Sequence, residues 1–587
     1  MNWNFKLLYK NEEEFKKDNE FLKNIIEDIK KFDGKLNEKE NLEKYLLMQD
    51  QIELYLSKQF TYLHMQYDLN QKDNDALTRY QMIYGLYMQI VSASSFADSQ
   101  IIELGYEKIK EWMKESDIIN RYSYFFDQLF NNQAHVLDAK SELLLSHFNN
   151  PLSDFNKLYD QLAVADNKSE DVTLSDGRTL SINNANYTSY LAVEKNQEDR
   201  KKIFEAVYKF YDQHKNTFAA IYKGIMDSNV ARMKARNYDS ILSLFLEHNK
   251  IPNDVFLNLV DVVHNNTSSL KKYYELRRKY FKLDRLYTFD RFLEMSNYVK
   301  NYSYEEAKEL YYKAIDSLGK KEFSDIARYV TEEGRIDVEI KDGKRTGAYS
   351  TGTYEEGPFI LLNFTHNLDD VFTLAHECGH SGHTTLANKN QPVNTANYVI
   401  FVAEVASTFN EQLLLDYLLQ NSNDKELKLS ILQNAIDGLI GTFYRQTLFG
   451  EYEYIAHNKL INGEGITSDS LSQIMIDLYK EYYNHDLTTE DYKKFVWCYI
   501  PHLYHTPFYV YQYATSFSAS LDIYQRVKNG EKDAYENYIK LLSSGGSDYP
   551  VKLLQKAGVD LTKKDAYLSV VKRLDYLVSE LEKVLGE

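Results

Sequence analysis

The stretch that decides the fold reads DDVFTLAHECGHSGHTTLANKN, residues 369–390. Apolar residues recur in it every three or four positions, acidic residues occupy its first turn, and Asn367 or Asp369 suits the N-cap position. The exit Asn-Lys-Asn-Gln-Pro, residues 388–392, ends the pattern. We therefore predict one long helix here.

Composition favours helices in the rest of the chain as well. The 587 residues include 43% hydrophobic and 27% charged residues, but only 7 Pro and 23 Gly. Many strands and tight turns would require more Pro and Gly. A chain this long exceeds the single-core limit of roughly 250–300 residues, so we expect more than one substructure.

Charge and cysteine usage restrict the partners and the compartment. The formal net charge of -18 argues against nucleic acid, because phosphate binding needs a concentrated basic face. The N-terminus lacks the pattern of a secretory signal, and no window approaches 18 apolar residues, so no membrane partner is predicted. Cys378 and Cys498 cannot supply a disulfide framework. We predict a cytoplasmic protein.

The N-terminal part of the chain is helical in pattern, with one exception. Residues 10–165 and 185–330 have apolar positions every three or four residues, which indicates antiparallel helices. The alternative, partner-binding or membrane-surface helices, fits less well because the polar faces mix both charge signs. Residues 170–183 alternate apolar and polar positions around Asp176-Gly177, which predicts a small hairpin.

A second break in the helical pattern precedes the long helix. Residues 335–364 contain clustered Gly and Thr and end in the apolar run GPFILLNF, so we predict a second small sheet. A strand edge ahead of a functional helix can pair with an extended peptide through backbone hydrogen bonds. A purely structural edge is the alternative, and the sequence does not separate the two.

The helix at 369–390 carries the clearest chemical motif, His376-Glu377-Cys378-Gly379-His380. Four residues span about one helical turn, so both imidazoles project from one face with a metal-sized gap between them. Glu377 lies beside that gap and can reach a water molecule at the metal. The spacing therefore predicts His376 and His380 as ligands of a catalytic zinc, with Glu377 as general base.

A catalytic zinc normally has three protein ligands, so one more is required. A third His ten residues after the first is excluded, because that position is Leu386. Glu404 ends an apolar run on a following helix, where a carboxylate needs a partner to offset its desolvation. Glu411, two turns later on the same face, is the alternative ligand or a partner that orients a histidine. We favour Glu404.

Two further residues of the motif helix are predicted to lie outside the metal site. His383 shares a face with the two histidines, but a fourth protein ligand would close the site, so we interpret it as a supporting or packing residue. Cys378 points away from the His face and is interpreted as packing.

A hydrolytic site of this kind needs hydrogen-bond donors for a developing oxyanion. The stretch from Ile500 to Ala514 holds two histidines and four tyrosines, which we call the His/Tyr segment. Its candidate residues for this role are His502, Tyr504, His505, Tyr511 and Tyr513. Structural packing is the alternative for each of them.

At these residues the chain resembles the thimet oligopeptidase-like zinc metallopeptidases, and within them oligoendopeptidase F. HECGHSGH matches the family pattern His-Glu-x-Gly-His-x-x-His, and residues 401–407 match the segment that supplies the third ligand. Further matches are Gly347-Ala-Tyr349, residues 507–514, residues 544–550 and residues 557–560, so the resemblance spans about 345–560.

The resemblance implies that His376, His380 and Glu404 hold zinc and that Glu377 is the general base. It also implies an almost wholly helical molecule that encloses a deep channel for short peptides. Relatives place their catalytic His and Tyr with slightly different spacing, so assignment within the His/Tyr segment stays open. By order along the chain, residues 1–190 correspond to a helical N-terminal region and 191–587 to the catalytic region.

The resulting hypothesis is a cytosolic zinc endopeptidase that hydrolyses internal bonds of oligopeptides. The first alternative is a helical zinc exopeptidase, because the same metal chemistry serves both activities. The second alternative is a helical scaffold without enzymatic activity, in which the HECGH motif is accidental or holds a structural metal. Two His and a carboxylate also accept divalent ions other than zinc. Oligomeric state and cleavage preference are not predicted.

Overall fold

The computed structural model describes residues 2–586, and helices dominate it as the composition predicts. Contacts divide the chain into two compact units, each assembled from three stretches of sequence. Unit 1 comprises residues up to 134, 299–420 and 523–559, and unit 2 comprises 135–298, 421–522 and the residues from 560 onward. More than one substructure is thereby confirmed. The predicted boundary at residue 190 divides the chain by its order in sequence and not by contacts, and it stays a prediction.

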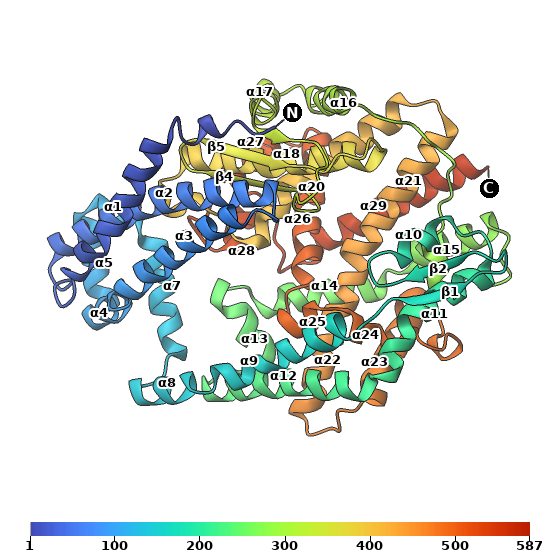
Figure 1. Cartoon of the computed structure of the whole chain (residues 1–587), viewed down its shortest axis with the longest axis horizontal. Helices are drawn as coiled ribbons and strands as arrows, with labels where there is room; N and C mark the ends of the chain where they lie inside the picture. The colour runs from blue at the N-terminus through green and yellow to red at the C-terminus, as the bar shows by residue number, and fades with distance from the viewer. Residues whose placement is uncertain (1, 587) are drawn as a thin grey trace. The chain divides into compact units, whose positions relative to one another are not determined.

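Unit 1 combines a layer of N-terminal helices, a small sheet and a group of later helices (Figure 1). Its helices are α1 (Glu12–Lys30), α2 (Lys39–Leu69), α3 (Asn74–Ala93), α4 (Ala97–Leu104), α5 (Tyr106–Glu115), α6 (Asp117–Arg121), α7 (Ser123–Asn132), α16 (Tyr304–Asp316), α17 (Lys321–Val330), α18 (Leu368–Asn390), α19 (Val393–Ala396), α20 (Ile400–Asn421), α27 (Ala534–Leu542) and α28 (Pro550–Lys556). The antiparallel neighbours α1, α2 and α3 lie side by side and bury their apolar faces in a common core.

The predicted sheet at 335–364 is present and belongs to unit 1. Strands β3 (Ile336–Asp337), β5 (Gly357–Leu361) and β4 (Tyr349–Thr353) lie in that order, with β3 parallel and β4 antiparallel to β5. All five residues of β5 are buried, as expected of an apolar central strand. β4 is an edge strand. Ile360 donates its N–H to Arg335 on the β3 side, so the backbone groups of Ser350, its partner in register on β4, face the free edge.

The motif helix α18 begins and ends where the sequence predicts. The Asn367 side chain accepts a hydrogen bond from the Asp370 N–H, and the Asp370 carboxylate accepts from the Asn367 N–H, which makes a capping box. The helix packs against β4 and β5 along one side and against α16 and α17 along another. This packing fixes the helix that carries the chemical motif within unit 1.

Unit 2 holds the remaining helices and one hairpin. Its elements are α8 (Ala139–Ser146), α9 (Asn149–Asp160), β1 (Glu170–Thr173), β2 (Thr179–Ile182), α10 (Tyr187–Val193), α11 (Gln197–Gln213), α12 (Lys215–Ala235), α13 (Ile241–Leu246), α14 (Asn253–Asn265), α15 (Ser268–Tyr280), α21 (Lys425–Leu439), α22 (Arg445–Ile461), α23 (Ser468–Tyr483), α24 (Val496–Tyr499), α25 (His502–His505), α29 (Asp565–Leu585) and the first part of α26 (Tyr511–Lys528). Within residues 2–586 no helix combines the length and the apolar character needed to cross a bilayer.

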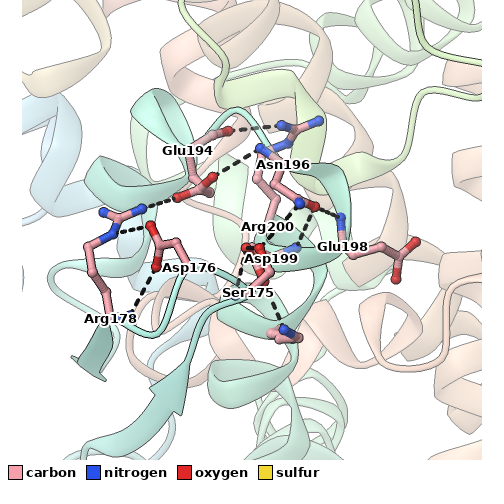
Figure 2. A network of polar contacts seen from close by, with 9 residues as sticks. Ser175, Asp176, Arg178, Glu194, Asn196, Glu198, Asp199 and Arg200 are labelled. Atoms are coloured by element: carbon pink, nitrogen blue, oxygen red, sulfur yellow. Dashed lines mark hydrogen bonds and ion pairs between the residues drawn. The ribbon is translucent and has the colours of Figure 1, made fainter.

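The hairpin predicted at 170–183 is confirmed, and side chains attach it to the start of α11 (Figure 2). Gly177 takes a φ of 87°, a left-handed conformation that this turn requires. The Ser175 N–H donates to both carboxylate oxygens of Asp199 at 3.0 Å, and Arg178 forms an ion pair with Glu194 at 2.9 Å. The hairpin is therefore a structural attachment within unit 2.

Candidate metal centre

Helix α18 brings His376 and His380 together as their spacing predicts. Their Nε2 atoms lie 3.1 Å apart, and the two rings are nearly perpendicular, with an interplanar angle of 80°. The side chains are 26% and 19% exposed, so the pair is sheltered but accessible. The two Nε2 atoms therefore face one small volume, which is the arrangement a metal ion requires.

Glu404, on the first turns of α20, completes the cluster. Its Oε2 lies 3.5 Å from His376 Nε2 and 3.6 Å from His380 Nε2. Within residues 2–586 this is the single group of three His, Cys, Asp or Glu side chains that could hold a metal ion. In a tetrahedral zinc site with bonds of about 2.1 Å, neighbouring ligand atoms are about 3.4 Å apart. The donor set and its separations fit zinc with one position left open.

The close approach of α18 and α20 depends on Gly379. A β-carbon at this position would lie 2.5 Å from the Ser407 Cα and 2.6 Å from the Ala406 carbonyl oxygen, both of them backbone atoms. Any other residue would therefore push α20 away from α18. Gly379 lets the helix that carries Glu404 lie directly against the helix that carries the histidines, a role that no pattern in the sequence reveals.

Hydrogen bonds to the far sides of the two imidazoles fix their orientation. Glu411 Oε1 lies 2.7 Å from His376 Nδ1, and the Ala403 carbonyl oxygen accepts from His380. Such bonds direct the other nitrogen of each ring toward the metal position. Of the two glutamates that the sequence offers, Glu404 therefore lies in the cluster with the two histidines, and Glu411 lies behind His376 and orients its ring.

Glu377 is held at the edge of the cluster by the sheet. Its side chain is only 6% exposed, and its carboxylate accepts a hydrogen bond from the Ser350 N–H on the free edge of β4. Burial raises the pKa of Glu377 to about 7, against the lowering effect of neighbouring His376. A carboxylate with this pKa exchanges a proton readily near neutral pH.

The pKa values of His376 and His380 shift in opposite directions, because the two rings face the same gap and a proton on one repels a proton on the other. Burial lowers the pKa of His376, but the hydrogen bond to Glu411 and the surrounding carboxylates raise it to about 9. Burial and the adjacent His376 lower the pKa of His380 to about 4. Protonation of one ring therefore makes protonation of the other costly, and His380 keeps the neutral form that ligates metals.

His383 and Cys378 lie outside the cluster. The His383 ring is buried and stacks on Tyr398, with centroids 3.6 Å apart and an interplanar angle of 7°. The Tyr398 hydroxyl in turn contacts Thr384 at 3.0 Å. Cys378 is 1% exposed and points toward Tyr311. Both residues pack the surroundings of the site, in line with their interpretation from the sequence.

A glycine pair far along the chain supports the segment that leads into α20. β-Carbons at Gly545 and Gly546 would lie 2.2 Å from the Thr395 carbonyl oxygen and 2.4 Å from the Asn397 carbonyl oxygen. The Gly546 N–H donates to the Thr395 carbonyl at 2.8 Å. These glycines allow backbone contact with residues 395–397, just ahead of the helix that supplies Glu404.

The His/Tyr segment belongs to unit 2 and divides into a surface group and a buried group. The rings of His502, Tyr509 and Tyr513 cluster, with centroids 5.5–6.2 Å apart. Tyr504 and Tyr511 are 0% and 1% exposed and pack in the unit 2 core.

Two contacts anchor the same segment within unit 2. His505 forms an ion pair with Asp160 at 2.9 Å. Glu453, on α22, is fully buried and accepts a hydrogen bond from the Phe508 N–H at 2.9 Å, where Phe508 takes a φ of 55°. Glu453 therefore holds the loop between α25 and α26. The sequence offers no motif for it, because it is one acidic residue in a helical stretch.

Comparison with known families and proteins agrees with this arrangement. Residues 190–572 match the model of Peptidase family M3, and residues 100–168 match the model described as Oligopeptidase F. The chain is 33% identical over 585 residues to Oligopeptidase PepF of Bacillus subtilis, which covers 99% of this chain and 87% of that protein. It is 32% identical to an oligoendopeptidase F homolog of Borreliella burgdorferi, over 99% and 98% of the two chains.

Solved structures show the same fold along the whole length. A putative peptidase from Chlamydophila abortus superimposes with a TM-score of 0.91 at 29% identity, covering 99% of this chain and 98% of that one. Oligoendopeptidase F from Enterococcus faecium gives a TM-score of 0.74 at 27% identity, covering 98% and 99%. With the motif, the fold and the full-length likeness in agreement, the chain belongs to peptidase family M3, in its oligoendopeptidase F group.

Proposed function

We propose that this peptidase is a zinc-dependent endopeptidase that hydrolyses internal peptide bonds of short oligopeptides. One observation carries the proposal: His376 Nε2, His380 Nε2 and Glu404 Oε2 converge within 4.8 Å of one another, beside the buried carboxylate of Glu377. The relatives named for oligopeptide cleavage support the substrate class. A zinc ion at this position would act as a Lewis acid toward the scissile carbonyl and would lower the pKa of water.

The protein's own residues divide the remaining work. Glu377 takes a proton from the attacking water and later gives one to the departing amine. The Ser350 N–H keeps the Glu377 carboxylate in place, and Glu411 keeps the His376 ring turned toward the ion. The Ser350 N–H on the free edge of β4 is used by Glu377, and the Gly352 carbonyl accepts from Thr61, so the other backbone groups of this edge are the ones that would pair with an extended peptide.

For the oxyanion we propose donors from the surface group of the His/Tyr segment. His502 and Tyr513 are partly exposed and lie in ring contact with Tyr509, whereas Tyr504 and Tyr511 are buried. His505 is exposed, but its ring is engaged with Asp160. A deep channel, a cytosolic location and the exclusion of nucleic acid and membranes stay predictions.

The test is Glu377→Gln, which keeps the size of the side chain but removes its ability to take a proton. Metal analysis should find one zinc per chain in both proteins, while the variant's kcat should fall by about 10²–10⁴-fold, the contribution of a general base. Glu355→Gln, at an exposed position in the turn between β4 and β5, is the matched control and should retain full activity. Undiminished turnover in Glu377→Gln would remove the proposed base.

Product analysis distinguishes endopeptidase from exopeptidase action. A peptide blocked at both ends should be cleaved internally, and mass spectrometry should show two fragments. An exopeptidase that requires a free terminus would leave the blocked peptide intact.

A further inference from the structure

Helix α3 presents an uncharged and largely exposed surface. Residues 80–97 contain no Asp, Glu, Lys, Arg or His, although 27% of the chain is charged. Charged side chains normally cover the solvent face of a surface helix. A helix of unit 1 that lacks them over several turns therefore has a face suited to an uncharged ligand.

Four of the five large apolar residues that are exposed on α3 lie along one face, and the fifth, Met82, lies apart from them. Tyr84, Tyr87, Met88 and Val91 are 52%, 41%, 48% and 45% exposed. Their spacing of three, four and seven residues places them on one helix face, beside the buried face that packs into the core. We call these four residues the α3 stripe. Contiguous exposed apolar residues of this kind mark binding surfaces more often than chance.

Aromatic contacts lead from the strand beside the metal centre to Tyr80, one helical turn before the α3 stripe. Tyr349, next to Ser350 on β4, lies 6.0 Å from the His64 ring of α2, and His64 lies 5.4 Å from the Tyr80 ring of α3. One turn further along α3, Tyr84 and Tyr87 are in ring contact at 6.1 Å. Helix α2 packs against both β4 and α3, and all of these elements belong to unit 1 (Figure 1).

We propose that the α3 stripe binds apolar and aromatic side chains of the peptide substrate at a distance from the bond that is cleaved. The inference rests on the proposed function and adds a preference for longer peptides with apolar residues far from that bond. A peptide that pairs with the free edge of β4 directs alternate side chains to either face of the strand. The face of β4 that carries Tyr349 is the side on which α2 packs, because the Tyr349 ring contacts His64 and its hydroxyl donates to Asp68 of α2.

Distances set the length of peptide required. Two helical turns separate Tyr80 from Tyr87, about 10 Å along the axis. The rings of Tyr349 and His64 are 6.0 Å apart, and those of His64 and Tyr80 are 5.4 Å apart. An extended peptide that starts at β4 therefore needs about seven residues to reach the middle of the α3 stripe. A six-residue substrate that occupies β4 on both sides of the cleaved bond therefore does not reach it, whereas a twelve-residue substrate does.

The chemistry of the α3 stripe fits a peptide better than other ligands. Helices that bind anionic membranes or nucleic acid carry Lys and Arg, and residues 80–97 carry none. Tyr and Met supply large adaptable contacts that accept many sequences, and Gln81, seven residues before Met88 and on the same face, can hydrogen bond to peptide amides. Met88 also lines a groove of about 550 Å³ with Ile26, Phe96, Lys30 and Asp33.

The test compares two variants of α3, one that changes the α3 stripe and a control that changes an exposed residue outside it. Tyr84→Ala/Tyr87→Ala/Met88→Ala removes the exposed apolar surface and keeps good helix formers. Met82→Ala is the matched control, because Met82 is 65% exposed on α3 but lies outside the α3 stripe. The probes are an internally quenched hexapeptide and two kinds of twelve-residue peptide that contain it. One kind carries the apolar extension Phe-Ser-Leu-Ser-Phe-Ser, and the other carries Gly-Ser-Gly-Ser-Gly-Ser. Each extension is tested at the N-terminus and at the C-terminus of the hexapeptide.

For the peptide with the apolar extension, we expect the triple variant to raise KM about fivefold or more with little change in kcat, because the lost contacts are made equally in ground and transition states. KM for the hexapeptide and for the Gly-Ser peptide should not change, and Met82→Ala should match wild type throughout. Equal KM values for triple variant and wild type on the apolar peptide would overturn the inference. A change from dimer to monomer in the triple variant, or binding of wild type but not the variant to lipid vesicles, would also overturn it.

A second measurement separates this inference from the proposed function. Fluorescence anisotropy gives the Kd of the labelled apolar twelve-residue peptide for the Glu377→Gln protein, with and without the three α3 substitutions. If no peptide is cleaved by wild type, the proposed function fails, and the Kd values still decide the role of α3. An unchanged Kd in the triple variant overturns that role even where cleavage is normal.

Discussion

Gly379→Ala is a single-carbon change that tests how the metal centre is built. The added carbon would meet the Ser407 Cα at 2.5 Å and the Ala406 carbonyl oxygen at 2.6 Å. Favourable carbon contacts begin near 3.5 Å, so α20 would have to move by about 1 Å. Both clashing atoms are backbone, so a change of side-chain rotamer cannot relieve the contact.

A shift of α20 should lower the free energy of unfolding only modestly, but it should weaken metal binding strongly. Overpacking costs about 1–3 kcal/mol, and the better helix propensity of Ala returns up to about 1 kcal/mol. We therefore expect a modest fall in the free energy of unfolding. Metal sites tolerate displacements of only about 0.2 Å, whereas Glu404 moves with α20, so metal affinity should fall by at least tenfold. A misplacement of about 1 Å near the reacting groups reduces turnover by about 10²-fold.

The assay compares Gly379→Ala with Gly382→Ala in the same helix. A β-carbon at Gly382 would meet only the Ile326 Cγ2 at 3.4 Å, so this control should fold and cleave as wild type does. Zinc affinity is measured by competition with a chromogenic chelator, stability by urea unfolding, and kcat/KM with a quenched peptide. Wild-type zinc affinity and kcat/KM in Gly379→Ala would refute the reasoning, since α20 would then have room that the structure denies it.

Three further predictions use other parts of the site. Glu411→Ala should lower zinc affinity by about 10–100-fold, because His376 loses the acceptor that orients it, and affinity equal to wild type would contradict this. Chelation of divalent ions should lower the thermal midpoint of wild type but not of His376→Ala, a difference that calorimetry would detect. Burial raises the pKa of Glu453 to about 8, so the folded protein keeps a proton that the unfolded chain releases above pH 4.5. Wild-type stability to urea should therefore decrease from pH 5 to 8, by up to about 1.4 kcal/mol per pH unit, whereas Glu453→Gln should lack this component.

The sequence predicts those features that depend on local patterns. The limits of α18 follow from the cap at Asn367 and the exit at Pro392, and the hairpin follows from Asp176-Gly177. The helix turn alone places His376 beside His380. In each case the interacting groups are separated by a few residues, so periodicity and turn chemistry are sufficient.

Contacts between distant segments were harder to predict. The choice between Glu404 and Glu411 depends on how α20 crosses α18, and that crossing depends on Gly379 meeting Ser407. A glycine inside a helix has no pattern that reveals which backbone it meets. The burial of Tyr504 and Tyr511 likewise depends on the surrounding helices, which a dense run of aromatic residues does not disclose.

The position of Glu404 is fixed by anchors at both ends of α20, and these anchors come from far beyond it in sequence. Before the helix, residue 395 accepts the Gly546 N–H at 2.8 Å. Near its end, Asp416 accepts the Tyr524 hydroxyl at 2.5 Å and pairs with Lys528. A helix held at both ends and pressed against α18 between them cannot shift its carboxylate freely. The three ligand atoms are therefore close to their final separations before an ion arrives, so little of the binding free energy is needed to order them.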